Sequence, residues 1–262
     1  MNGRVSASMR KALQASLSGN VDNIGTATAK ALLRRGLWSA ERNLTREGWL
    51  HAVANESLEV QSNALELPIK ELKNWSWTRR PEISAYEHYA SEGFIGSYCE
   101  GGAILLLIRA AALNYLHEIN TFGSRGDAVR RFTEAQLAIH SDKLDKLCHV
   151  VKNASLFEVR ENFREIYRDP YVQDWYPGLD DEKMLAIASA LSMSCLSKIT
   201  RAIGSDPYRF RKGWPDLTLA NSKGKMIWAE VKTTDKLLTS QIDTISNFRH
   251  LMPGEIILVH LN

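Results

Sequence analysis

Asp216, Glu230 and Lys232 are the residues whose types and spacing are best suited to chemistry in this sequence. Asp216 follows a proline and opens a short β-type run, while Glu230 and Lys232 stand two positions apart on the next such run. Side chains at positions i and i+2 of a strand point to the same face. The turn-forming residues 221–225 can close the two runs into a hairpin. We therefore expect the two acids to be neighbours, with the lysine beside them.

Two close carboxylates raise each other's pKa unless a cation lies between them. Oxygen ligands of this kind favour Mg²⁺ or Mn²⁺, which keep several waters and accept phosphate oxygens. A lysine on the same face can orient a water or neutralise charge that develops on a phosphate. The ordinary alternative for Glu230 and Lys232 is a solvated ion pair. Their apolar surroundings, residues 227–231, favour the metal site because an unexplained charge is costly there.

A longer string around these residues resembles a known nuclease family. Residues 211–217 read RKGWPDL and residues 229–241 read AEVKTTDKLLTSQ. These elements are similar, in the same order, to the pattern of the VRR-NUC branch of the PD-(D/E)XK nuclease superfamily. The resemblance implies a site made of the metal ligands Asp216, Glu230 and the backbone carbonyl of Val231, the catalytic lysine Lys232, and Gln241 at the start of the following helix.

A second element, Cys-Glu-Gly-Gly at 99–102, resembles the Glu-Gly element of the Fanconi-associated nucleases within this family. The resemblance implies that Glu100 is a third acidic ligand; the alternative is an ordinary acid at a helix N-terminus. The similarity covers about residues 84–262 and is strongest over 209–261. Residues 1–80 do not match the repeat and SAP domains of the long Fanconi-associated enzymes.

Apolar periodicity predicts mostly helices before the hairpin and a mixed pattern after it. The fold class we expect is α/β, leaning to α+β and helix-rich, with a restriction-endonuclease-like core and a helical insertion. Residues 1–80 are expected to form a basic helical module, either a winged helix that binds DNA or a helical cap, joined through 68–81 to a nuclease-like domain at 84–262. The expected helices are 8–17, 25–35, 45–54, 84–92, 100–120, 127–151, 158–167, 180–202 and 239–251, and the expected strands are 216–220, 226–232 and 255–261.

Charge along the chain is uneven, with basic stretches at 1–80 and 203–262 flanking an acidic middle. Basic ends around an acidic centre suit a protein that contacts a polyanion and holds a cation, although a solvated surface gives the same pattern. Rings alternate with cations over 208–212, a composition typical of segments that lie along nucleic acid. The candidate phosphate contacts are Lys30, Arg34, Arg35, Arg209, Arg211 and Lys212.

The three cysteines lack metal-ligand spacing, and no apolar stretch is long enough for a bilayer. We therefore expect a cytoplasmic protein with no membrane partner. The expected function is a Mg²⁺- or Mn²⁺-dependent deoxyribonuclease that hydrolyses phosphodiester bonds, selective for branched or ended DNA as in repair. Two alternatives stay open: a non-catalytic DNA-binding protein that keeps the fold, and an antibacterial nuclease toxin with a cognate inhibitor protein. A homodimer would supply the two sites needed to cut both strands.

Overall fold

The computed structural model describes residues 5–73, 75 and 80–262. The chain divides into two compact units, one made of residues 1–67 with 234–243 and the other of residues 68–233 with 244–262. The division thus falls at residue 67, whereas the sequence suggested a module that ends at 80. Residues 74 and 76–79 of the expected connection lie outside the described part of the chain.

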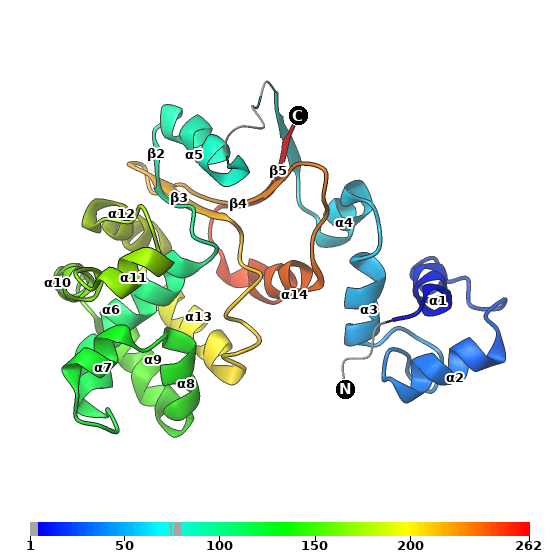
Figure 1. Ribbon diagram of the computed structural model, residues 1–262, viewed down its shortest axis with the longest axis horizontal. Coiled ribbons are helices and arrows are strands. Elements are labelled where there is room, and N and C mark those ends of the chain that lie inside the picture. Colours follow the sequence, from blue (N-terminus) through cyan, green and yellow to red (C-terminus); the bar gives the residue numbers. More distant parts are fainter. Residues whose placement is uncertain (1–4, 74, 76–79) are drawn as a thin grey trace. The chain divides into compact units, whose positions relative to one another are not determined.

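The first unit is helical, and the described part of it contains the three helices that the sequence predicts and a fourth that it does not (Figure 1). A buried cluster that includes Leu13, Leu32 and Trp38 holds the first two helices together. Hydroxyl side chains at Ser6, Thr45 and Ser57 cap three of the helix N-termini by accepting backbone N–H bonds. The helices are α1 (Ala7–Leu17), α2 (Thr26–Arg34), α3 (Arg46–Val53) and α4 (Leu58–Leu65).

The second unit is built on a mixed sheet with the order β1-β5-β4-β3-β2 among its described residues. The pairs β1–β5 and β5–β4 are parallel, and β4–β3 and β3–β2 are antiparallel. Three of these strands match the sequence prediction; β1 and β2 were missed because four-residue runs carry little periodicity. The strands are β1 (Ile69–Leu72), β2 (Phe94–Ser97), β3 (Leu217–Asn221), β4 (Met226–Lys232) and β5 (Glu255–Leu261).

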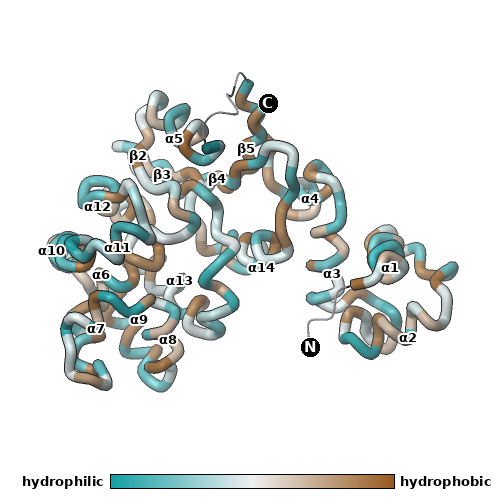
Figure 2. Tube along the Cα trace, viewed as in Figure 1, coloured by the Kyte–Doolittle hydropathy of each residue, from teal (hydrophilic) through white to brown (hydrophobic). Residues whose placement is uncertain are grey.

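Both faces of the sheet are covered, and Figure 2 shows hydrophobic stretches along the strands. Helix α5 (Pro81–Ser91) packs Ala85 and Tyr89 on one face, against residues such as Leu219 and Val231. The other face is covered by a helical group around the largely apolar α6 (Figure 1). That group comprises α6 (Gly102–Glu118), α7 (Arg125–Arg130), α8 (Thr133–Ile139), α9 (Leu144–Asn153), α10 (Leu156–Tyr167), α11 (Pro170–Trp175), α12 (Asp181–Leu191) and α13 (Met193–Ser205).

Two helices that the sequence predicts as continuous are broken in the structure. The span 127–151 breaks into α7, α8, a 3₁₀ turn and α9, because the backbone is extended at Arg131 and Phe132 and the Thr133 hydroxyl donates to Leu105 O (2.7 Å). The span 180–202 breaks at Ser192, which has φ 65° and caps α13. Apolar spacing continues across both breaks, so periodicity could not reveal them.

The last helix, α14 (Thr239–Phe248), is divided between the units at residue 243. Phe248, near its C-terminal end, packs against Trp214 with ring centroids 4.8 Å apart. Within the described residues, no helix is long and apolar enough to cross a membrane. The helix-rich α+β class predicted from the sequence is confirmed.

Candidate active site

The β3–β4 hairpin brings Asp216 and Glu230 together as the spacing predicts. The antiparallel register pairs Leu217 with Ala229, so continuing it by one residue places Asp216 opposite Glu230. The Val231 N–H donates to Asp216 Oδ2 at 2.8 Å and fixes that carboxylate at the end of the hairpin. Lys232 Nζ lies 2.9 Å from Glu230 Oε1. The two acids and the lysine therefore form one cluster.

Strand alternation explains why charged groups are buried here. Met226 and Trp228 point into the core beneath the helical group, and Glu230 and Lys232 follow on the same face of β4. Glu230 is 0% exposed and Lys232 is 5% exposed. A buried charge of this kind is costly unless an opposite charge compensates it. The pair between Glu230 and Lys232 supplies part of that compensation.

Burial disfavours the ionised form of both carboxylates. Burial raises the pKa of Asp216 to about 6, although the hydrogen bond from Val231 and the charge of Lys232 act in the opposite direction. Burial, together with the charge of Asp216, raises the pKa of Glu230 well above the ordinary glutamate value. Lys232 offsets this only in part. A cation between the acids would relieve both penalties.

Glu100 approaches this cluster from the turn that precedes α6. Its backbone lies in the left-handed region at φ 36°, a strained conformation for a residue with a side chain. The Gly213 N–H donates to its carboxylate (3.1 Å), and its charge raises the pKa of both Asp216 and Glu230. The turn thus presents the carboxylate to the acid cluster.

The glycines of the Cys-Glu-Gly-Gly element are required by close packing. Gly101 has φ 75°, and a Cβ there would lie 2.4 Å from Trp214 Cγ. A Cβ at Gly102 would lie 2.4 Å from Tyr176 Cδ1. The first contact is with the base of the Trp214 side chain and the second with the edge of the Tyr176 ring, and both side chains are buried. Close packing therefore explains the two glycines, whatever the role of Glu100 between them and Cys99.

We expect Gly101→Ala to lower the free energy of unfolding by about 2 to 5 kcal/mol, because a left-handed alanine is strained and the added methyl overlaps Trp214. Gly123→Ala is the matched control: Gly123 has φ 61°, but nothing lies within 4 Å of its added methyl. That control should cost about 1 to 2 kcal/mol. Urea unfolding of both variants checks the difference, and equal losses would contradict the packing argument.

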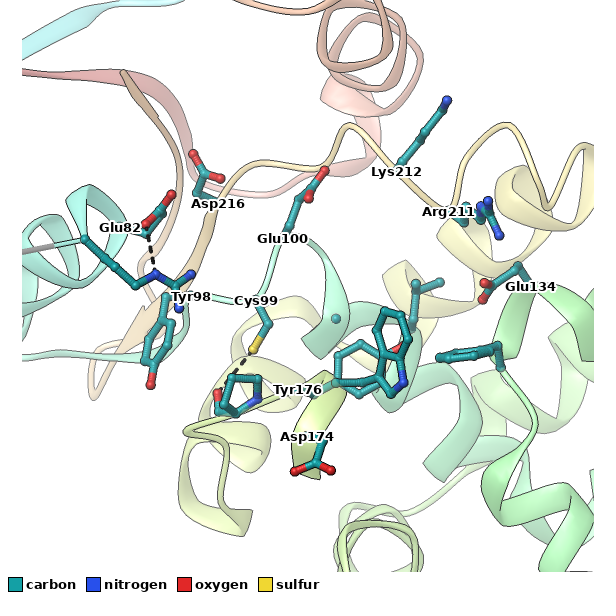
Figure 3. A pocket seen from close by; sticks show the side chains of 16 residues that line it. Glu82, Tyr98, Cys99, Glu100, Glu134, Asp174, Tyr176, Arg211, Lys212 and Asp216 are labelled. Carbon is teal, nitrogen blue, oxygen red and sulfur yellow. Dashed lines mark hydrogen bonds and ion pairs between the residues drawn. The ribbon is translucent and has the colours of Figure 1, made fainter. Parts of the chain in front are cut away.

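Glu82 is an acid of this site that sequence reasoning missed. It lies in the first turn of α5, beside Asp216 in Figure 3, and its charge raises the pKa of Asp216. Arg80 Nε lies 3.7 Å from its carboxylate. The only sequence signal was an acid after Pro81 at a helix start, which is common at ordinary helices.

A cleft of about 690 Å³ opens beside these acids (Figure 3). Asp216 and Glu82 lie at one side of it, Glu134 and Arg211 at the other, and Glu100 between them. Arg211 and Lys212 are exposed along its wall, and their contacts with phosphates stay predictions. Arg209 is also exposed, with its guanidinium 4.9 Å from the centre of the Phe210 ring.

The other predicted site residues belong to the first unit. Gln241 accepts a hydrogen bond from the Leu238 N–H (2.8 Å) at the start of α14, and its role in catalysis stays a prediction. Lys30, Arg34 and Arg35 are exposed on α2 and directly after it. Their contacts with DNA also stay predictions.

The donor set fits a hard divalent cation. Mg²⁺ in proteins is commonly held by one or two carboxylates and several waters. Asp216 and Glu230 supply that number, and the carbonyl of Val231 lies between Glu230 and Lys232 in the chain. No three His, Cys, Asp or Glu side chains in the described part of the chain lie close enough together to hold a metal ion. Glu100 as a third ligand therefore stays a prediction.

The fold of this chain is similar to that of solved structures of the nuclease paFAN1. A crystal structure of paFAN1 bound to 1-nt 5′-flap DNA with a gap matches 97% of this chain and 49% of that chain, with a TM-score of 0.54 and 17% identity. A second paFAN1 structure, bound to 2-nt 5′-flap DNA with a gap, matches 97% of this chain and 48% of that chain, with a TM-score of 0.49 and 18% identity. The resemblance predicted from the sequence is thus confirmed at the level of the fold.

The chain spans about half the length of the paFAN1 chains that it matches. No family model and no curated protein matches this sequence.

Proposed function

We propose that this protein is a divalent-metal-dependent deoxyribonuclease that hydrolyses phosphodiester bonds of branched or ended DNA. The observation that carries the proposal is the cluster that Asp216 forms with the buried Glu230 and Lys232 at the end of the β3–β4 hairpin, beside an open cleft. The nuclease fold supports hydrolysis as the reaction. The likeness to a protein crystallised on a 5′ flap supports branched or ended DNA as the substrate.

In this proposal, Asp216, Glu230 and the carbonyl of Val231 hold Mg²⁺ or Mn²⁺, with Glu100 as a further ligand. When bound, the ion acts as a Lewis acid on the scissile phosphate. Lys232, whose ammonium is fixed 2.9 Å from Glu230, donates to the attacking water and orients it toward phosphorus. Its charge also stabilises the negative charge that grows on the phosphate in the transition state.

The cations of the cleft wall position the DNA strand in this mechanism. Arg211 and Lys212 are exposed and close to the acids, so they suit the phosphates that flank the scissile bond. Arg209 would contact the strand farther along, and Lys30, Arg34 and Arg35 would bind the backbone from the first unit. Gln241 would contribute near the reacting phosphate. A homodimer and an inhibitor protein stay predictions.

The proposal is tested by incubating the purified chain with linear, supercoiled, single-stranded and branched DNA in Mg²⁺, Mn²⁺ or EDTA. We expect cleavage in either metal, none in EDTA, and the fastest cleavage on branched or ended DNA. Gel separation of the products also distinguishes internal from terminal cuts. Binding without cleavage in both metals would contradict the nuclease proposal and favour a DNA-binding protein that keeps the fold.

A further inference from the structure

The part of the cleft away from the catalytic acids is aromatic. Phe132 and Trp175 line it with their rings edge to face, 5.4 Å between centroids, and Tyr176 lies beside them. Trp175 is 58% exposed, a costly state for a ring of this size that is held in a fixed arrangement. Tyr171 contacts both Phe132 and Trp175 from the outside, with centroids 6.0 and 6.4 Å away. The result is an ordered aromatic surface that faces the cleft.

A buried acid completes this region. Glu134 is 7% exposed, its Oε2 has no hydrogen-bond partner among the described residues, and its carboxylate lines the cleft (Figure 3). Arg109 lies near it and is 1% exposed, with Nη1 donating to Val129 O at 2.7 Å. An unpaired buried acceptor is costly, so Glu134 suits a ligand that brings a donor.

The charged side chains that line the cleft indicate which part of a nucleotide the aromatic end can bind. Glu134 and the exposed Asp174 repel a phosphate from the aromatic rings, whereas Arg211, at the same side of the cleft as Glu134, attracts one (Figure 3). Lys212 lines the same cleft and attracts phosphates as well. The aromatic end therefore suits the neutral, flat part of a nucleotide whose backbone follows the cations. The amino groups of bases donate hydrogen bonds, which a glutamate carboxylate can accept.

We propose that Phe132, Glu134, Trp175 and Tyr176 form a base pocket that binds the base of an unpaired nucleotide next to the scissile phosphate. This rests on the proposed function, because it takes the acids at the other end of the cleft as the cutting site. Trp175 stacks on the base, and Glu134 accepts a hydrogen bond from its amino group. The cleft volume of about 690 Å³ leaves room for the nucleotide.

The test uses DNA hairpins that end in one unpaired nucleotide at the 5′ or the 3′ end, carrying either a base or an abasic sugar. Affinities are measured by fluorescence anisotropy in EDTA, where no cleavage occurs. We expect the wild-type chain to bind the base-carrying end about 10-fold more tightly than the abasic end. Trp175→Ala should remove this difference and Trp175→Phe should retain it. Because Trp175 is exposed, neither change should disturb folding.

Phe157→Ala, at a 73% exposed aromatic ring on α10, is the matched control and should leave the difference unchanged. Equal affinity of wild type for base-carrying and abasic ends, or a difference that survives Trp175→Ala, would overturn the base pocket. An unpaired cytosine should bind more tightly than N3-methylthymine, whose base carries no N–H donor, and Glu134→Gln should reduce that preference. Equal binding of the two bases by wild type would overturn the role of Glu134. Because these measurements need no cleavage, a failure of the nuclease proposal can be distinguished from a failure of the base-pocket proposal.

Discussion

Glu230→Gln is expected to slow DNA cleavage by about 100- to 1000-fold, because it removes one of the two carboxylates that can hold the metal ion. Lys232→Met should have an effect of similar size, since it removes the ammonium 2.9 Å from Glu230 Oε1. Single-turnover rates with saturating protein on the preferred DNA substrate measure both effects. Affinity for DNA in EDTA should not fall for Glu230→Gln, because glutamine has nearly the same shape and brings no negative charge to the cleft.

The matched control for this experiment is Glu255→Gln. Glu255 is an exposed glutamate at the start of β5, the strand next to β4, and it pairs with Lys225 on the surface. Its replacement should leave the cleavage rate within about twofold, as is usual for surface changes. A Glu230→Gln protein that cuts as fast as the Glu255→Gln protein would contradict the assignment of this cluster as the catalytic site.

Asp216→Asn is expected to make the metal-free protein more stable, while it abolishes metal binding. Burial raises the pKa of Asp216 from the ordinary 3.8 to about 6, so the folded state binds this proton more tightly than the unfolded state does. The wild-type protein therefore loses stability as pH rises from about 4 to about 6, and the loss is complete above pH 6. Asparagine does not ionise, yet its side-chain oxygen can still accept the Val231 N–H. The variant should gain about 2 to 3 kcal/mol at pH 8 in EDTA.

Urea unfolding at pH 8 and at pH 3 measures this gain, which should largely disappear at pH 3, where the wild-type carboxyl is mostly protonated in both states. Adding Mg²⁺ at pH 8 should stabilise the wild type and not the variant. Asp127→Asn is the opposite control: hydrogen bonds from Arg131 lower the pKa of Asp127, so its removal should destabilise the protein at pH 8. A loss of stability in Asp216→Asn at pH 8 would contradict the desolvation argument.

Sequence reasoning identified the hairpin because its signals are local. Pro215 and Asp216 mark the start of β3, the run 221–225 is polar and turn-forming, and Glu230 and Lys232 share a face by strand periodicity alone. The turn 99–102 was visible through its two glycines. Helix breaks at Phe132 and Ser192 were not visible, because they depend on contacts with other elements and not on the apolar spacing along the chain.

By itself, the sequence determined which acids and which lysine share one hairpin, and the class of fold that holds them. These follow from the period of a strand and from turn chemistry, which act over a few residues. Only the tertiary structure placed Glu82 beside Asp216 and joined Phe132, Glu134 and Trp175 in one wall of the cleft. Glu82 lies on α5, Phe132 and Glu134 lie directly before α8 and in its first turn, and Trp175 ends α11, so long stretches of chain separate them. Their meeting is decided by how helices pack on the two faces of the sheet, and no local pattern encodes that packing.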